Sequence, residues 1–261
     1  MRVATWNVNS VGARLPRLLE WLREAGPEVV CLQETKCAAD AFPHDAVREL
    51  GYESVAHGDG RWNGVAVLSR VGLADVRHGL PGDPGYPTPE VHEARALAAT
   101  TGPLRVWSVY VPNGREPSHD HYAYKLEWLS ALRDATAEDA GGALPFAILG
   151  DYNVAPTDDD VWDPAAFVGS THVTPPERAA LAALLGTGLR DVVPRPLKYD
   201  RPYTYWDYRA GMFHRNLGMR IDLVFGNAPF AAAVKDAYVD RAARKGKGAS
   251  DHAPVVVDLE L

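Results

Sequence analysis

Side chains that could hold a metal ion or move a proton follow one short apolar run near the middle of the chain. Asp151 and Asn153 come almost directly after the run 145–149, with Gly150 before them. An apolar run of this length that ends at such a break predicts a strand buried on both faces. Residues two apart on an extended segment point the same way. We therefore expect the carboxylate and the carboxamide to face one spot at a strand end, where open α/β sheets bind ligands.

The same stretch has a second interpretation, because Gly, Asp and Asn are ordinary turn formers. In both interpretations Gly150 is expected to let the chain turn sharply and to lift the two polar residues out of the sheet. The other polar residues at or inside expected strands distinguish a ligand-binding strand end from an ordinary turn. They are Asn7, Glu34, Tyr110, Asn113, Asp222, Asp251 and His252.

Each of these residues also has a separate structural explanation. Asn7 or Asn9 could form a turn, Glu34 could be a solvated acid, and Asp251 could cap a helix beside a surface histidine. Asp222 is harder to explain in this way, since a carboxylate inside an apolar run is costly to bury without a partner. Taken together, the separate explanations require many independent coincidences at equivalent ends of a sheet.

Carboxylates that converge on one edge of a sheet repel each other unless a cation lies between them. Hard oxygen ligands of this kind select Mg²⁺ or Mn²⁺ rather than zinc. A histidine, a tyrosine and carboxamides around such an ion suit the in-line attack of water on a phosphodiester. A carboxylate or a His–Asp pair would orient the water, and neutral donors would hold the non-bridging oxygens.

Alternating strands and helices are expected to position these residues. Segments 2–8 and 28–33 are predicted strands, joined by a helix at 15–25 that Gly26-Pro27 ends. A right-handed crossover makes two such strands parallel, so Asn7 and Glu34 should reach the same edge. Further strands are predicted at 52–57, 64–69, 71–77, 93–100, 104–111, 203–208, 219–225 and 255–261, and helices at 43–50, 122–138 and 176–185, with a loop at 211–218. No repeat or linker interrupts this alternation, which predicts one α/β domain over residues 1–261.

Composition narrows the class of protein. Hydrophobic residues make up 46% of the 261 residues, enough for a sizeable core. No signal peptide and no apolar run of roughly 18 residues is present, so no membrane association is expected. Cys31 and Cys37 form neither a disulfide framework nor a zinc motif, which fits the reducing cytoplasm. The net charge of -7 argues against a non-specific coating of nucleic acid, but it allows a local basic patch.

Six motifs follow one another along the chain. They are Thr5-Trp-Asn-Val-Asn9, Leu32-Gln-Glu-Thr-Lys36, Tyr110-Val-Pro-Asn113-Gly, Gly150-Asp-Tyr-Asn153, Arg220-Ile-Asp222 and Ser250-Asp-His-Ala-Pro254. In this order and spacing the chain resembles, over essentially its whole length, the exonuclease III / abasic-site endonuclease family of the endonuclease–exonuclease–phosphatase superfamily. Tyr205-Trp-Asp-Tyr-Arg209 matches the bacterial exonuclease III pattern. The resemblance implies a four-layer α/β sandwich of the DNase I-like type, with two packed mixed β-sheets flanked by helices.

The resemblance also implies a metal site and a group that activates water. Glu34 would ligate Mg²⁺, with Mn²⁺ as the alternative ion, and Asp251 and Asn9 would lie nearby. Asp151, held by Asn7, would position or deprotonate the attacking water.

Other matching positions would bind the phosphate. Asn153 would stabilise the scissile phosphate, and His252, oriented by Asp222, would bind or polarise it. Tyr110 and Asn113 would donate hydrogen bonds to the phosphate oxygens.

A third set of positions would contact DNA. Arg115 would reach the backbone, whereas Tyr205, Trp206 and Met219 fall where the family lines the pocket for a base-less sugar. Apolar and aromatic walls can accept such a flipped-out deoxyribose. The basic loop 241–247, and the arginines Arg201, Arg209, Arg215 and Arg220, are expected to grip the duplex on either side of the site. The alternative for these cations is a solvated basic surface.

The function implied is that of a Mg²⁺-dependent DNA repair phosphodiesterase. It would act as a monomer on double-stranded DNA, incising 5′ to abasic sites and removing 3′ nucleotides or 3′ blocking groups. Two alternatives stay open from the sequence. One is another phosphodiesterase or phosphatase of the same superfamily, and the other is a catalytically silent DNA-binding module.

Overall fold

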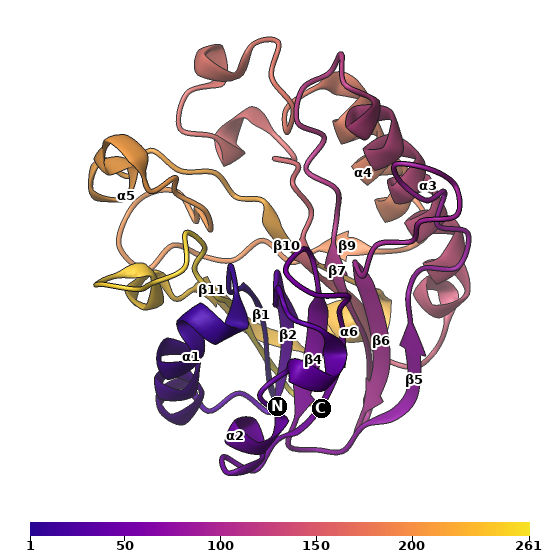
Figure 1. Ribbon diagram of the computed structural model, residues 1–261, viewed down its shortest axis with the longest axis vertical. Helices are drawn as coiled ribbons and strands as arrows, with labels where there is room; N and C mark the ends of the chain where they lie inside the picture. The colour runs from indigo at the N-terminus through magenta and orange to yellow at the C-terminus, as the bar shows by residue number, and fades with distance from the viewer.

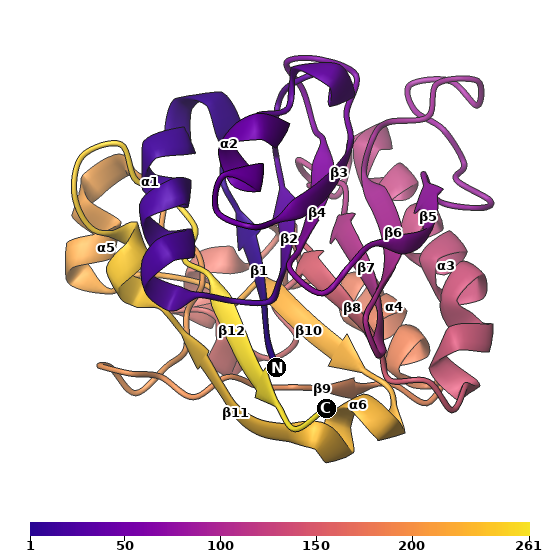
Figure 2. The same cartoon turned by 90° about the horizontal axis from the view of Figure 1, so that it is seen from below.

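Two six-stranded β-sheets pack face to face in the computed structural model, which describes residues 1–261 (Figures 1 and 2). The first sheet has the strand order β11 (Val234–Val239), β12 (Val255–Leu259), β1 (Arg2–Asn7), β2 (Val29–Gln33), β4 (Val65–Ser69), β3 (Glu53–His57). The second has the order β5 (Ala74–His78), β6 (Ala96–Thr101), β7 (Leu104–Tyr110), β8 (Phe146–Asp151), β10 (Asp222–Gly226), β9 (Arg190–Asp191). Both sheets are mixed. The pairs β1–β2 and β7–β8 are parallel, and the other strand pairs are antiparallel.

Helices cover the two outer faces. α1 (Val11–Ala25) and α2 (His44–Arg48) pack on the first sheet, and α3 (Asp120–Gly141) and α4 (Pro175–Leu185) pack on the second. The short helices α5 (Met212–Arg215) and α6 (Ala228–Ala233) belong to neither outer layer, and their Phe213 and Phe230 join the apolar cluster between the sheets. The four-layer α/β sandwich that the resemblance implies is therefore confirmed. None of the helices combines the length and the apolar character that crossing a membrane requires.

The two-residue repeat of the strands sorts their side chains between the layers. Val29 and Leu149 lie in the apolar core between the sheets, whereas Trp6 packs under α1 and Ile148 lies under α3 and α4. Asp151 shares the parity of Leu149, so its side chain belongs to the layer between the sheets. The same parity places Asn7, Tyr110 and Asp222 in that layer, at one end of it.

Gly150 does not turn the chain, which corrects the expectation from sequence. It lies inside β8, where an added Cβ would come within 1.9 Å of the Val109 carbonyl oxygen on β7. A glycine is therefore needed for close strand packing. The left-handed residue is Asn153, with φ 50°, so the turn comes after the strand. Asp151 stays in β8 and pairs in register with Tyr110 on one side and Asp222 on the other.

Other element boundaries also differ from those expected. α1 begins at Val11 rather than at residue 15, because the Ser10 side chain accepts a hydrogen bond from the Ala13 amide and caps it. The segment 203–208 is not a strand. Only Tyr205 forms isolated bridges there, with Met219 and His252. The segment expected as a loop at 211–218 contains α5.

Candidate active site

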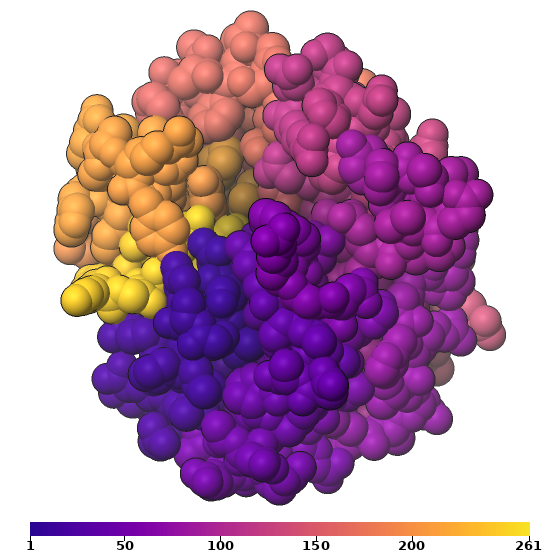
Figure 3. Space-filling view, in the orientation of Figure 1, coloured from indigo at the N-terminus to yellow at the C-terminus, as the bar shows by residue number.

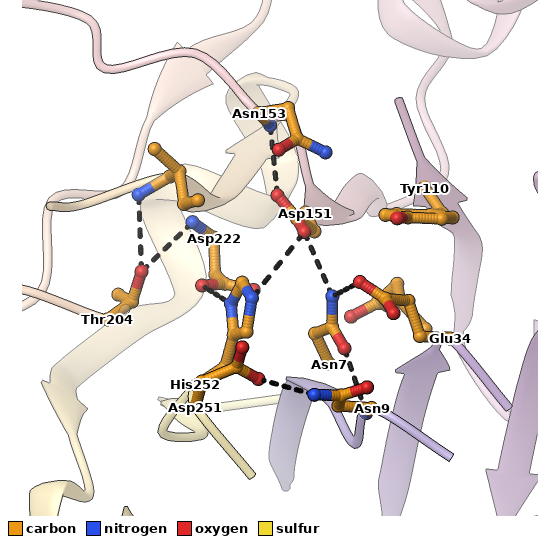
Figure 4. A network of polar contacts seen from close by, with 12 residues as sticks. Asn7, Asn9, Glu34, Tyr110, Asp151, Asn153, Thr204, Asp222, Asp251 and His252 are labelled. Atoms are coloured by element: carbon orange, nitrogen blue, oxygen red, sulfur yellow. Dashed lines mark hydrogen bonds and ion pairs between the residues drawn. The ribbon is translucent and has the colours of Figure 1, made fainter. Parts of the chain in front are cut away.

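The ends of five strands meet at one end of the layer between the sheets. Asn7 ends β1, Tyr110 ends β7 and Asp151 ends β8, while Asp222 begins the antiparallel β10. Glu34 follows β2 directly. Asp251 and His252 lie in the loop that leads into β12 (Figure 4). The face of the molecule in Figure 3 is hollowed between the orange segment near residues 200–220 and the magenta segments.

A polar layer separates this site from the apolar core. Gln33 on β2 donates a hydrogen bond to Ser108 on β7 over 3.0 Å and accepts one from Thr5 on β1 over 3.1 Å. Ser108 in turn donates to the Leu32 carbonyl over 3.0 Å. All three side chains are buried, so these bonds tie the two sheets together just below the site.

The carboxamide of Asn7 joins two carboxylates. Its Nδ2 donates to Glu34 Oε1 over 2.8 Å and to Asp151 Oδ2 over 2.9 Å. The other oxygen of Asp151 accepts from the backbone N–H of Asn153 over 2.9 Å. Both carboxylate oxygens of Asp151 are therefore fixed by neutral donors, and Asn7 links this residue to Glu34 across the gap between the sheets.

His252 is bound to Asp222 and faces Asp151. Its Nδ1 lies 2.7 Å from Asp222 Oδ2, and its Nε2 lies 3.8 Å from Asp151 Oδ2. The backbone amide of Asp222 donates to the hydroxyl of Thr204 over 3.1 Å, which fixes the start of β10. Asp222 Oδ1 is buried and has no hydrogen-bond partner. The His252 ring is thus held by one carboxylate and directed at another.

Burial and neighbouring charges shift the pKa values of this cluster. Burial raises the pKa of Asp151, His252 opposes this rise, and the charges of Asp222 and Glu34 add to it, so that the pKa is about 7. Burial alone would lower the pKa of His252, but the carboxylates of Asp222 and Asp151 raise it to about 10. Both pKa values are raised, which leaves a protonated imidazole beside a carboxylate that can accept a proton near neutral pH. At neutral pH His252 carries a proton, and Asp151 can take one up.

The acidic residues fit a hard divalent cation. Glu34, Asp151 and His252 each offer one ligand atom, and these atoms lie within 4.8 Å of one another. Carboxylate oxygens are the ligands that Mg²⁺ and Mn²⁺ prefer. Asp251 accepts a hydrogen bond from Asn9 over 3.1 Å and lines the same cavity, so both expected neighbours of the metal lie at the site.

Lys36 compensates part of this negative charge and was missed from sequence. Its Nζ lies 2.7 Å from Glu34 Oε2 and donates to Asn9 Oδ1 over 2.6 Å. Although burial alone would raise the pKa of Glu34, Lys36 and the Asn7 hydrogen bond lower it. Glu34 and Lys36 both have left-handed backbones, with φ 52° and 51°. Backbone hydrogen bonds to neighbouring loops hold this unfavourable turn, including Ser10 N–H to the Glu34 carbonyl over 2.7 Å.

Two carboxamides and a phenol face the cavity beside the acids. Asn113 Nδ2 donates to Asn153 Oδ1 over 3.1 Å, and Asn153 Nδ2 donates to the Val111 carbonyl over 3.0 Å. The Tyr110 ring lies under the guanidinium of Arg95, 4.8 Å from its centroid, and Arg95 also donates to the Tyr110 carbonyl. Burial raises the pKa of Tyr110 well above its usual value, so the phenol remains a proton donor at neutral pH.

A cavity of about 220 Å³ opens onto these groups. Tyr205, Met219 and Ile221 form apolar parts of its wall, and His172 lies in it as well. Trp206 does not line this cavity, which corrects the expectation from sequence. Only 1% of Trp206 is exposed, and its indole donates to Asn216 and packs against Phe213.

Two of the expected DNA-gripping arginines are buried instead. Arg220 forms ion pairs with Asp160 and Asp191, over 2.6 and 2.9 Å. Arg244 packs over Phe213 and donates to the Trp206 carbonyl. Both residues stabilise loops around the site and cannot reach a ligand.

The remaining cationic side chains of these segments differ in whether an acidic residue forms an ion pair with them. Arg201 and Arg209 form ion pairs with Asp159 and Asp207. Arg115 and Arg215 are exposed and without an acidic partner, and the loop residues Lys245 and Lys247 are exposed as well.

A model of the Endonuclease/Exonuclease/phosphatase family matches residues 4–252. The chain belongs to this family. It is 29% identical to the exodeoxyribonuclease III of Haemophilus influenzae, and the alignment covers all of both chains.

Solved structures of family members superpose closely on this chain. The 3′-5′ exonuclease NExo from Neisseria meningitidis is 37% identical, with a TM-score of 0.93 and complete coverage of both chains. An AP endonuclease from Archaeoglobus fulgidus is 33% identical, with the same TM-score and coverage. A further Neisseria structure, of the 3′ phosphatase NExo bound to a product DNA hairpin, is 36% identical with a TM-score of 0.93.

Proposed function

We propose that this family member hydrolyses phosphoester bonds in double-stranded DNA, at 3′ ends and at abasic sites, and uses Mg²⁺. One observation carries the proposal. Asp151, with its raised pKa, lies 3.8 Å from a His252 that Asp222 holds, and Asn7 links Asp151 to the metal-binding candidate Glu34. An acidic group that can accept a proton, a cationic donor and a metal ligand are the parts that phosphoester hydrolysis requires.

In the reaction, Asp151 accepts a proton from a water molecule that attacks the phosphorus in line with the departing oxygen. The water oxygen forms a bond to phosphorus as the P–O bond to the leaving group breaks. His252 Nε2 and the Tyr110 hydroxyl donate to non-bridging oxygens, and so do the carboxamides of Asn113 and Asn153. A divalent ion held by Glu34, with Asp151 or Asp251, would stabilise the negative charge on the departing oxygen.

The names of the relatives support DNA as the substrate. They include an exodeoxyribonuclease III, a 3′-5′ exonuclease, an AP endonuclease and a 3′ phosphatase bound to a DNA hairpin. The cavity of about 220 Å³ is smaller than the roughly 300–1,000 Å³ of pockets that enclose drug-sized ligands. Its size and its apolar wall of Tyr205 and Met219 suit a terminal or base-less sugar phosphate better than an intact nucleotide.

The test uses two labelled duplexes, one with a 3′-phosphate at a nick and one with an abasic-site analogue. We expect turnover of both with Mg²⁺ and of neither with EDTA, and we expect no hydrolysis of an inositol phosphate. Binding of DNA without turnover would favour the catalytically silent alternative. Hydrolysis of the inositol phosphate alone would favour another activity of the superfamily.

The proposal also covers the location, the domain organisation and the oligomeric state of the protein. A DNA substrate implies an intracellular location, and we propose that residues 1–261 act as one domain and as a monomer. Size-exclusion chromatography with light scattering tests the monomer, since the chain has a mass of 28.4 kDa.

A further inference from the structure

We propose that Lys125, held in place by Glu177, is a positioning residue that fixes Asn113 and Asn153 for phosphate binding. The inference rests on the proposed function, which gives those two carboxamides their role. Lys125 lies on α3 and Glu177 on α4, behind the second sheet, and neither residue lines the cavity. Both side chains are completely buried.

The ammonium of Lys125 has as many strong acceptors as it has hydrogens. Its Nζ donates to the Asn113 carbonyl over 3.1 Å, to the Asn153 carbonyl over 2.7 Å and to Glu177 Oε1 over 2.5 Å. An ammonium carries three hydrogens, which these three short contacts use, and the Thr171 hydroxyl lies farther away, at 3.4 Å. One buried cation therefore joins the backbones of two residues that line the cavity.

The two backbones need such a tie because they turn sharply at these positions. Asn153 has a left-handed backbone with φ 50°, and Gly114, directly after Asn113, has φ 90°. A side chain on Gly114 would also collide, since its Cβ would lie 2.7 Å from Thr171 Oγ1 and 3.1 Å from Lys125 Cδ. The turn after β7 thus closes against the Lys125 side chain, and the turn after β8 is held by its ammonium together with His172, whose Nδ1 lies 2.5 Å from the Asn153 carbonyl oxygen.

Glu177 fixes the position of the ammonium. Its Oε2 accepts hydrogen bonds from the backbone and the hydroxyl of Thr174, which caps α4. Its Oε1 accepts from the Thr171 hydroxyl over 2.6 Å and from the His172 amide over 3.0 Å, besides Lys125. A carboxylate with this many fixed donors cannot shift, so Lys125 cannot shift either. Helices α3 and α4 therefore set the spacing of the two carboxamides through this pair.

The competing explanation is that the pair only joins α3 to α4. The double variant Lys125→Met with Glu177→Gln separates the two explanations, because it removes both charges and nearly preserves volume. Replacing both members of a buried ion pair is often neutral for stability, whereas removing one member leaves a buried charge unpaired. The double variant still deprives the carbonyls of Asn113 and Asn153 of their Lys125 donor.

The experiment measures the melting temperature and the kinetics of 3′-phosphate removal from a nicked duplex. We expect the double variant to stay folded and to lose about 10- to 100-fold in kcat, the scale of small displacements in an active site. KM should change by less than about threefold. The control is Asn227→Ala. Asn227 is equally buried but directly follows the far end of β10, where its Oδ1 accepts hydrogen bonds from the backbone amides of Phe146 and Phe230. This control variant should have a lower melting temperature, and its kcat should equal that of the wild type at temperatures at which the variant is folded.

A double-mutant cycle measures whether the effect of Asn113→Ala on kcat depends on the Lys125–Glu177 pair. No such dependence is expected if the pair only joins α3 to α4. If Lys125 acts through Asn113, Asn113→Ala should lower kcat much less in the double variant than in the wild type. Additive effects, or an unchanged kcat in the double variant, would overturn the proposal.

The side-chain amide signals of Asn113 and Asn153 in ¹⁵N NMR spectra test the positioning without turnover. We expect separate, protected signals in the wild type and averaged ones in the double variant. Identical signals in the two proteins would overturn the proposal. A wild type that does not hydrolyse the duplex would contradict the proposed function alone, and these signals would still decide whether Lys125 positions the two residues.

Discussion

At the scale of single residues, Asp151 is the group on which turnover should depend most. Asp151→Asn keeps the shape, but it accepts from only one of the two N–H donors that Asp151 binds, and it cannot take a proton from water. We expect kcat to fall about 10²- to 10⁴-fold, the usual contribution of a general base. DNA affinity, measured by fluorescence anisotropy, should hold or rise because the variant removes a negative charge near the phosphate. Near-full activity in this variant would falsify the role given to Asp151.

The same substitution should not destabilise the protein. Asp151 is buried beside the carboxylates of Asp222 and Glu34, and these like charges raise its pKa. Removing its charge relieves that repulsion and offsets the loss of one accepted hydrogen bond, so the melting temperature should change little. Asp236→Asn on the exposed face of β11 breaks only an exposed ion pair with Arg195 and serves as the control for activity.

The sequence could predict those site residues that follow an apolar run. It could not predict the buried residues that hold them in place. Asp151 and Glu34 stand out because a polar residue ends a strand. Lys125 looks from sequence like any polar residue of an amphipathic helix, since Glu177 lies 52 positions away. Arg244 resembles a DNA-binding cation in sequence, because nothing local shows that Phe213 covers it. Burial of a charge is decided by partners remote in sequence.

At the scale of elements, the pairing of β7 with β8 brings Tyr110 and Asp151 side by side. Gly150→Ala places a Cβ 1.9 Å from the Val109 carbonyl, and both backbones must move apart. We expect a loss of about 1–3 kcal/mol in the free energy of unfolding, as for other overpacked sites, together with a lower kcat. Chemical denaturation and single-turnover kinetics measure the two effects.

Gly12 provides the matched control for this substitution. It lies in α1, and an added Cβ there would meet nothing within 4 Å. Gly12→Ala should stabilise the protein by up to about 1 kcal/mol, because alanine favours the helix. Equal effects of the two substitutions would contradict the role given to Gly150.

The junction between the loop after β7 and α3 should weaken in acid. His121 Nδ1 accepts a hydrogen bond from the Gly114 amide over 3.0 Å, which requires this nitrogen to be unprotonated. Burial, followed by the charge of Arg95, lowers the pKa of His121 to about 4, while Glu93 opposes and Arg115 and His119 assist. The unfolded chain therefore binds a proton at His121 that the folded protein excludes between about pH 6.5 and pH 4.

The sign of this effect follows from the lowered pKa. The contribution of His121 to stability is complete above about pH 6.5, and it is lost as the pH falls toward 4, by up to about 3 kcal/mol. His121→Asn keeps an acceptor near the Nδ1 position and removes the titration. Urea denaturation between pH 7 and 4 should show a shallower loss of stability for this variant. An unchanged pH dependence would contradict this assignment.

Element boundaries were predictable where apolar periodicity was local. The parallel pairing of 2–7 with 29–33 is confirmed, because the helix between them requires the crossover. The aromatic residues of segment 203–208 have a high propensity for strands, but the segment forms only isolated bridges. Tyr205 pairs with Met219 and His252 instead of joining the edge of a sheet. Propensity alone does not provide a strand with a partner.

At the scale of the whole molecule, an acidic protein with a net charge of -7 must bind DNA through a local group of cations. Among these, Arg215 on α5 and Lys247 in the loop before Ser250 are exposed. Arg215→Glu with Lys247→Glu should weaken binding of a duplex and reduce the slope of log K against log salt by about one for each phosphate that is no longer neutralised. Arg48→Glu is the control, because α1 lies between α2 and α5 in both views (Figures 1 and 2). Titrations at several salt concentrations decide the matter. An unchanged slope in the double variant, or an equally weakened affinity in the control, would show that DNA binds elsewhere.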